Sequence, residues 1–186
     1  MREEERPGRQ FHGDPARLRS PERVARLEPE RVVALSLEGG PVETVLDVGT
    51  GTGLFAEAFS ASGVAVTGVD VNADSLEVAR QHVPNGRFVE ALAAALPFAD
   101  GSFDVVFIAH VLHEADDPLR VLQEAARTAR KRVVVVEWPF REEAYGPPLQ
   151  HRLRPERIAA LARSAGLSGQ THVGLSHVEI YAFSAA

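Results

Sequence analysis

The stretch VLDVGTGTG, residues 45–53, decides how this chain folds. An apolar run, typical of a buried strand, gives way to three glycines spaced two apart, which favour a tight turn into a helix. Together with the next residues, GTGLFA at 51–56 satisfies the pattern GxGxxA, a variant of the dinucleotide-binding fingerprint. The stretch therefore predicts a nucleotide-binding turn, and a nicotinamide- or flavin-dependent enzyme is one class that fits it.

An acid, Asp47, stands just ahead of these glycines. In a pyrophosphate-binding turn, the negative charge of the ligand meets backbone N–H groups and the positive end of the helix dipole. A carboxylate about 4 Å from that charge would cost roughly 1 to 4 kcal/mol. A ligand that carries an ammonium and a sulfonium, as S-adenosylmethionine (SAM) does, reverses the sign of this energy. Asp47 therefore favours SAM over a dinucleotide.

Outward from the glycine loop, apolar strands alternate with helical patterns. We expect strands at 44–49, 64–70, 87–90, 103–109, 132–138, 168–174 and 177–184, and helices at 53–62, 73–82, 117–129 and 155–165. Continuous apolar strands separated by helices indicate an α/β fold with a doubly wound, mostly parallel sheet. The last two strands are joined by about two residues, Leu175 and Ser176, so the final strand is expected to run antiparallel.

The residues before the first strand predict two short helices, because Pro21 follows the candidate cap Ser20 and Pro29 makes a second start. Residues 1 to about 15 are polar and rich in Pro and Gly, and we expect a tail there. We therefore divide the chain into residues 1–40, a tail with helices that act as a lid, and residues 41–186, a cofactor-binding domain.

Composition narrows the classes of partner. A net charge of −6 and a pI near 5.6 argue against nucleic acid, which needs clustered basic residues, and favour a small molecule. The absence of cysteine excludes thiolate metal sites and a cysteine nucleophile. The charged start MREEERPGRQ and the lack of an apolar run of about 20 residues predict a cytoplasmic protein that does not insert into membranes. The oligomeric state is left open.

A second acid, Asp70, closes the predicted strand 64–70 and lies 17 residues after Gly53. An acceptor at this place can bind both ribose hydroxyls of an adenosine. Alternatively, Asp70 caps the helix that begins near Ala73, a role that Asn72 fills as well. The ribose role is favoured, and it indicates an adenosine ligand without separating SAM from a dinucleotide.

Four stretches of the chain match motifs of a known family in the same order: VLDVGTGTGLFAEAF (45–59), VTGVDVNADSLEVAR (66–80), LPFADGSFDVVFIAHVLHEADDPLRVLQEAARTAR (96–130) and GPPLQHRLRPERIAALARSAGL (146–167). Together they resemble the class I SAM-dependent methyltransferases, in the branch similar to the ubiquinone and menaquinone biosynthesis C-methyltransferases. The resemblance implies a Rossmann-like, seven-stranded sheet whose last strand is antiparallel. It also implies SAM as cofactor and S-adenosylhomocysteine (SAH) as product.

The resemblance further implies roles for single residues. The loop glycines would let the backbone approach the methionine part of SAM, Asp47 would face its ammonium, Asp70 would hold the ribose, and Val71 would pack on the adenine. Ala109 is expected beside the methionine part as well, because the predicted strand 103–109 ends there. The cofactor-binding residues expected are therefore Asp47, Gly49, Gly51, Gly53, Asp70, Val71, Leu92, Ala93 and Ala109.

Leu92 departs from the family pattern, because the family usually has there an Asp that bonds the adenine amino group. We expect the backbone of Leu92 and Ala93 to recognise adenine instead, with Glu90 as the alternative acceptor. This departure predicts a somewhat weaker affinity for the cofactor.

The stretch HVLHE, residues 110–114, follows the strand that ends at Ala109. Methyl transfer needs a nucleophile held about 3 to 3.5 Å from the methyl carbon, and a base is optional. His110 is the candidate general base or acceptor-orienting group, because a near-neutral imidazole suits the deprotonation of an enol, a phenol or an activated carbon. We assign His113 to packing, and disfavour a metal site formed by the two histidines because no third ligand is evident.

A polar loop, PFREEAYGPPLQHRL, follows the strand that ends at Trp138 and is expected at the rim of the substrate site. Tyr145 and Arg152 are its candidates for substrate binding and His151 for catalysis, with a solvated connector as the alternative. Arg23, on the N-terminal helices, is a further candidate to bind an anionic acceptor or the SAM carboxylate. The alternative is an exposed surface arginine without a ligand, which is the commoner case.

The leading hypothesis is a SAM-dependent methyltransferase that acts on carbon or oxygen of a small-molecule acceptor. The segment FIAHVLHE lacks the Asn/Asp-Pro-Pro-Tyr/Phe signature of many base and amide N-methyltransferases. Two alternatives remain open at this point: a SAM- or SAH-binding module without catalysis and, less favoured, an NAD(P)-dependent oxidoreductase.

Overall fold

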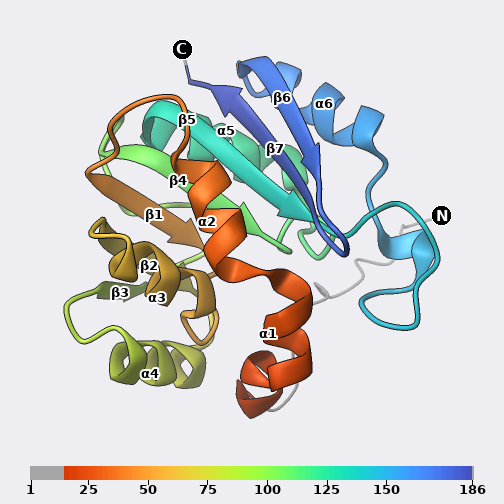
Figure 1. Ribbon diagram of the computed structural model, residues 1–186. Coiled ribbons are helices and arrows are strands. Elements are labelled where there is room, and N and C mark those ends of the chain that lie inside the picture. Colours follow the sequence, from red (N-terminus) through yellow and green to blue (C-terminus); the bar gives the residue numbers. More distant parts are fainter. Residues whose placement is uncertain (1–14, 186) are drawn as a thin grey trace, which may run out of the picture.

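A seven-stranded sheet in the order β3-β2-β1-β4-β5-β7-β6 forms the centre of the computed structural model, which describes residues 15–185 (Figure 1). The strands are β1 (Thr44–Val48), β2 (Ala65–Asp70), β3 (Arg87–Glu90), β4 (Phe103–Ala109), β5 (Ala129–Glu137), β6 (Ser168–Gly174) and β7 (Glu179–Ser184). The pairs from β3 to β5 are parallel, whereas β7 is antiparallel to β5 and β6. The expected mixed sheet with a reversed final strand is confirmed.

The strand order places a crevice at the middle of the sheet. From β1 the chain winds outward through β2 to β3, and then returns to lay β4 on the other side of β1. In an open α/β sheet, ligands bind outside the carboxyl ends of the strands at such a reversal. Every residue of β4 is buried, so the strand beside this crevice is tightly packed.

Helices cover both faces of the sheet. They are α1 (Pro21–Leu27), α2 (Pro29–Leu37), α3 (Leu54–Ala61), α4 (Ala73–His82), α5 (Pro118–Thr128) and α6 (Pro155–Ser164), with the 3₁₀ helices η1 (Pro15–Arg19) and η2 (Leu149–His151). The predicted starts at Pro21 and Pro29 are confirmed. At α4, Asn72 Oδ1 accepts the amide N–H of Ser75 at 3.0 Å. Asn72 is therefore the helix cap, and the capping alternative for Asp70 falls away.

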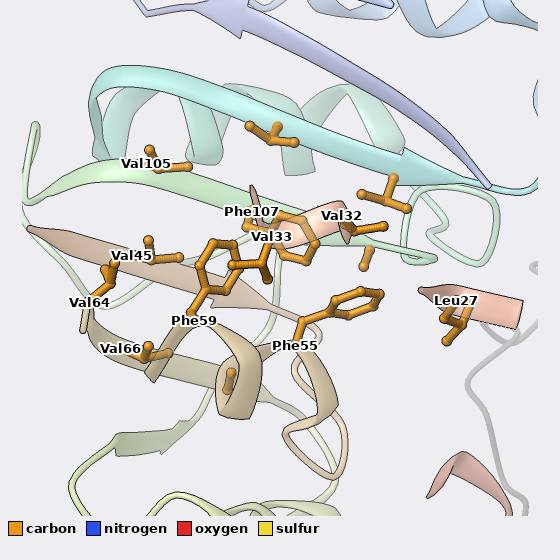
Figure 2. Packing of buried hydrophobic residues seen from close by; sticks show 14 of the residues in the cluster. Leu27, Val32, Val33, Val45, Phe55, Phe59, Val64, Val66, Val105 and Phe107 are labelled. Carbon is orange, nitrogen blue, oxygen red and sulfur yellow. The ribbon is translucent and has the colours of Figure 1, made fainter. Parts of the chain in front are cut away.

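The apolar side chains form one cluster on each face of the sheet. On one face α2, α3 and α4 pack against the strands, and on the other α5 and α6 do so. Figure 2 shows Phe55 and Phe59 of α3 beside Phe107 of β4, with ring centroids 5.1 and 5.0 Å from that of Phe107. This packing fixes α3, and with it the loop that precedes α3.

Helix α2 is a layer of the core, although the division at residue 40 placed it with the lid. Val32 and Val33 are at most 1% exposed and belong to the same cluster as Val45 and Phe107 (Figure 2). Leu27, the last residue of α1, belongs to this cluster as well, so the lid stays a prediction for η1 and the rest of α1. The expected tail falls almost wholly on residues 1–14, outside the described part of the chain. No helix within residues 15–185 has the length and apolarity needed to cross a membrane.

Candidate functional site

A cavity of about 940 Å³ opens at the carboxyl ends of β1 to β4. The glycine loop forms one side of it, and Leu18 and Arg23 reach it from η1 and α1. The residues expected from the sequence that line it are Arg23, Gly49, Gly51, Asp70, Val71, Leu92, Ala93, Ala109 and His110. The cavity is within the size range of small-molecule and cofactor sites.

The glycine loop is pinned to β2 by its backbone. The amides of Gly49 and Thr50 both donate to the carbonyl of Val69, at 2.8 and 2.9 Å. Gly49 has a φ of +70°, and a Cβ there would lie 2.3 Å from Cγ2 of Val111. Only glycine fits this position, because the turn is left-handed and the space is already filled.

Gly53 differs from the other loop glycines, because it does not line the cavity. A Cβ at this position would lie 2.9 Å from the Cβ of Ala79 on α4. The third glycine thus allows α3 to approach α4, which is a packing role and not a contact with the ligand.

Asp70 joins the glycine loop to the turn after β2. Its Oδ2 accepts the amide of Gly51 at 2.8 Å, and its Oδ1 accepts the amide of Asn72 at 2.9 Å. Each carboxylate oxygen keeps acceptor capacity for a further donor. Since Asp70 also lines the cavity, it can receive hydroxyl groups of a ligand.

Asp47 lies beneath the loop and is not among the described residues that line the cavity. It is 1% exposed, and its Oδ2 accepts the hydroxyl of Thr50 at 2.7 Å. Burial, opposed by this hydrogen bond and reinforced by the charge of Asp70, raises the pKa of Asp47 to about 7. The structure thus places its carboxyl one layer behind the surface that would touch a ligand.

His110 has a strained backbone, and its ring nitrogens have no hydrogen-bond partner among the described residues. Its φ is +59°, a left-handed conformation that is uncommon for a residue other than glycine and that often marks functional sites. Its ring packs on Trp138, with centroids 4.5 Å apart. Burial, aided by the charges of Arg23 and His113, lowers the pKa of His110 well below its usual range. His110 therefore presents a neutral imidazole to the cavity.

His113 also lines the cavity, so packing alone does not describe it. Its Nδ1 lies 2.8 Å from Oε2 of Glu137, and both side chains are at most 5% exposed. Burial lowers the pKa of His113, but the hydrogen bond and the charge of Glu137 outweigh it and the net pKa is raised. Because Glu137 engages Nδ1, proton exchange with a ligand is left to the second ring nitrogen, Nε2, which lies 3.7 Å from Oε1 of Glu114.

Glu137 was missed from the sequence. It ends β5 directly after four buried valines, and the parallel pairing of β4 with β5 brings it beside the segment that follows β4. An acid at the carboxyl end of an otherwise apolar strand is the signal that could have identified it. Within residues 15–185 no group of three or more His, Asp or Glu side chains is arranged to hold a metal ion.

The three candidates from the loop after β5 do not line the cavity. Arg152 is buried and uses its guanidinium inside the loop, donating to the carbonyls of Pro139, Pro147 and Tyr145 and to Glu143. The hydroxyl of Tyr145 bonds the ring of His177, and His151 lies on η2. Arg152 therefore holds the loop together, and the roles expected for these three residues stay predictions.

Buried polar atoms without a partner gather around the cavity. Of six such atoms in the described residues, four belong to side chains that line it: Nε of Arg23, Oγ1 of Thr52, and Nδ1 and Nε2 of His110. Buried polar groups in native proteins are nearly always hydrogen-bonded. A ligand in the cavity is the natural source of the missing partners.

Comparison with known proteins gives the family. A model described as "Methyltransferase domain" matches residues 46–136. A ubiquinone biosynthesis O-methyltransferase from Nitrosomonas europaea is 30% identical over 173 residues, covering 77% of this chain and 72% of that protein. The chain belongs to the class I SAM-dependent methyltransferases. This membership decides against the nicotinamide-dependent oxidoreductase that the glycine pattern had left open.

Two further matches place this chain among its relatives. A demethylmenaquinone methyltransferase from Renibacterium salmoninarum is 33% identical over 117 residues, covering 63% of this chain and 49% of that protein. The chain spans about half the length of the first curated relatives that it matches. The crystal structure of a SAM-dependent methyltransferase from Aquifex aeolicus superposes with a TM-score of 0.81 at 24% identity, covering 94% of this chain and all of that one, and shows the same fold.

The cavity of this chain fits the cofactor of its family. SAM carries a ribose, whose hydroxyls suit the free acceptor capacity of Asp70. Its ammonium or its carboxylate can bond the unpartnered hydroxyl of Thr52. Val71 and Leu92 are 37% and 58% exposed in the cavity wall, and offer apolar surface for an adenine.

Proposed function

We propose that this methyltransferase transfers a methyl group from SAM to a carbon or oxygen atom of a small-molecule acceptor. The observation that carries the proposal is the gathering of unpartnered buried polar atoms in one cavity with the glycine loop and Asp70. Among the relatives, the name of the ubiquinone biosynthesis O-methyltransferase supports oxygen as the acceptor atom, and the resemblance to C-methyltransferases supports carbon. A cytoplasmic location stays a prediction.

We assign the cofactor along the cavity wall. Gly49, Gly51 and Ala109 would line its methionine part, and Asp70 would accept its ribose hydroxyls. Adenine would lie between Val71 and Leu92, with the backbone of Leu92 and Ala93 as its polar contact. Asp47 would act through its charge from beneath the loop, because Thr50 stands between its carboxyl and the cavity.

His110 and His113 would handle the acceptor. When bound, SAM supplies an electrophilic methyl group on a sulfonium. The neutral ring of His110, packed on Trp138, can accept a hydrogen bond from the acceptor and orient it. His113 can take the acceptor's proton on Nε2, because Glu137 holds Nδ1 and stabilises the imidazolium that forms.

The lid would exclude water from this reaction. Arg19 of η1 donates from Nε and Nη2 to the carbonyl of Thr52, at 3.1 and 2.7 Å, and from Nη1 to Glu57 at 2.7 Å. The same segment carries Leu18 into the cavity. Closure of the lid is thus tied directly to the glycine loop, which would couple cofactor binding to water exclusion.

The test is SAH release on a panel of phenols, enols and activated methylene compounds. We expect release above the blank with at least one acceptor, and a loss of about 10²- to 10⁴-fold in rate for His113→Gln with SAM affinity retained. A SAM-binding module without catalysis is the second candidate, favoured by Leu92 at the usual Asp position. SAM binding without turnover on any acceptor would support that candidate and contradict the first.

A further inference from the structure

A second hollow, of about 570 Å³, adjoins the cofactor cavity. It shares Leu18, Arg23, Trp138 and Gly146 with that cavity, and Arg17, Ser20 and Arg26 complete its lining. We call this hollow the arginine vestibule. It lies where η1 and α1 meet the loop after β5, so a molecule that occupies it can extend directly into the cofactor cavity.

The vestibule concentrates positive charge in a chain whose net charge is −6. None of Arg17, Arg23 and Arg26 forms an ion pair with another described residue, although the neighbouring Arg19 is paired with Glu57. Arg26 lies over the ring of Tyr145, with its Cζ 4.3 Å from the ring centroid. Three arginines that lack a carboxylate partner among the described residues thus line one hollow.

Arg23 connects the two compartments. Its Nε is buried and has no hydrogen-bond partner among the described residues. Of the charges that act on its guanidinium, Glu114 attracts and Arg26 repels, and no direct bridge to Glu114 is formed. A planar guanidinium binds a carboxylate or a phosphate through paired hydrogen bonds. An anion between Arg23 and Arg26 would supply the missing partner and relieve the repulsion.

We propose that the arginine vestibule binds an anionic group, a carboxylate or a phosphate, of the methyl acceptor. This inference rests on the proposed function, since it names the acceptor class of the same site. Trp138 lines both the vestibule and the cofactor cavity, and its ring packs on that of His110 with the centroids 4.5 Å apart. An acceptor lying along Trp138 therefore has its anionic end at the arginines and its reacting end at His110.

Calorimetric titration of the whole chain with benzoate, phenyl phosphate and benzamide, each with and without SAH, tests the proposal. We expect at least one of the two anions to bind tenfold or more tightly than the neutral benzamide, and the tighter anion identifies the preferred group. In the Arg17→Ala/Arg26→Ala variant this preference should disappear, while SAH affinity stays within twofold. The matched control is Arg157→Ala/Arg163→Ala, which removes two exposed arginines from α6 and should leave the preference intact.

Three results would overturn the proposal: benzamide binding as tightly as both anions, the preference persisting without Arg17 and Arg26, or SAH affinity falling together with the preference. The last result would mean that these arginines hold the cofactor's own carboxylate. If SAH fails to bind to the wild-type chain while arginine-dependent anion binding persists, the proposed function is wrong but the vestibule is still an anion-binding site.

Discussion

At the scale of single residues, the two acids near the glycine loop differ by depth. Asp70 lines the cavity and bridges two backbone amides, whereas Asp47 is buried beneath the loop. From the sequence both could be linked to a cofactor, because both lie at strand ends. Their depth could not be predicted, since it depends on which side of β1 the loop covers.

Asp70→Ala should weaken the binding of SAM and of SAH by about 10- to 100-fold. The change removes hydrogen bonds to a charged acceptor, each of which is worth about 1.5 to 3 kcal/mol. Calorimetry measures the effect. Asn72→Ala is the control: it should cost stability of about 1 kcal/mol through the lost α4 cap and leave the affinity nearly unchanged. Wild-type affinity in Asp70→Ala would exclude the ribose role.

Asp47→Asn should stabilise the protein at high pH and weaken SAM binding. A carboxyl whose pKa is raised from 3.8 to about 7 on folding binds more protons in the folded state, so stability falls as the pH rises through this window. At pH 8 the variant should be more stable than the wild type by up to about 4 kcal/mol, and at pH 4 by much less. Urea unfolding at both pH values measures this difference.

SAM affinity of the same variant at pH 8 tests the role of the buried charge. We expect it to fall because the variant removes the buried negative charge beneath the glycine loop. Unchanged affinity together with raised stability would mean that the Asp47 carboxyl destabilises the fold and does not contribute to ligand binding.

Glu137→Gln should move the pH profile of methyl transfer to lower pH. The wild-type rate should rise with pH through a midpoint above 6.5, because His113 accepts a proton only when neutral and its pKa is raised. Without the carboxylate the imidazolium loses its stabilising partner, so the midpoint falls. NMR titration of the His113 ring gives the same pKa independently. The control His151→Gln, outside the cavity, should keep the wild-type profile, and an unmoved midpoint in Glu137→Gln would remove Glu137 from the mechanism.

At the scale of secondary structure elements, local signals decided most of the boundaries. Pro21 and Pro29 start α1 and α2, and the change from strand to helix periodicity marks the rest. One strand begins earlier than predicted: β5 starts at Ala129, because that residue pairs with Phe103 on β4 across a register shift. Such pairing across the sheet leaves no trace in the strand's own periodicity.

The loop after β5 was the element least open to prediction. Its polar composition suggested a substrate rim, but the internal hydrogen bonds of Arg152 turn it into a self-contained unit. A buried arginine and an exposed one look alike in sequence. The distinction depends on carbonyl groups that face the side chain only after the loop has folded.

Gly49→Ala should disrupt the glycine loop. The new Cβ would clash with Val111 at 2.3 Å and force a left-handed φ on a residue with a side chain, at a combined cost of about 2 to 5 kcal/mol. Cofactor binding should be lost even in molecules that remain folded. Gly63→Ala is the matched control, because φ at Gly63 is also positive, at +81°, but no atom lies within 4 Å of the new Cβ. We expect this variant to lose about 1 to 2 kcal/mol of stability through backbone strain and to bind the cofactor normally. Equal effects in both variants would show that backbone strain alone matters. Thermal unfolding and SAH titration measure the two quantities.

At the scale of the whole molecule, the sheet topology creates the site. After β3 the chain returns to place β4 beside β1. This arrangement brings Gly49, Asp70 and His110 to one cavity, although they are far apart in sequence. It could be predicted that Gly49 and Asp70 line this cavity, because their motifs are local. The pair of His113 and Glu137 could not, since it joins the ends of two strands, and the arginine vestibule could not, since it joins the N-terminal helices to the loop after β5.

The central claim is that this cavity binds SAM. Calorimetric titration of the whole chain with SAM, SAH, NAD⁺ and NADP⁺ under one set of conditions tests it most directly. We predict one site per chain for SAM and SAH, and no competition from either dinucleotide, because the fold, the acids and the unpartnered polar atoms all suit an adenosine that carries a cationic methionine tail. Tighter binding of NAD⁺ or NADP⁺, or no binding of SAM and SAH, would contradict the claim.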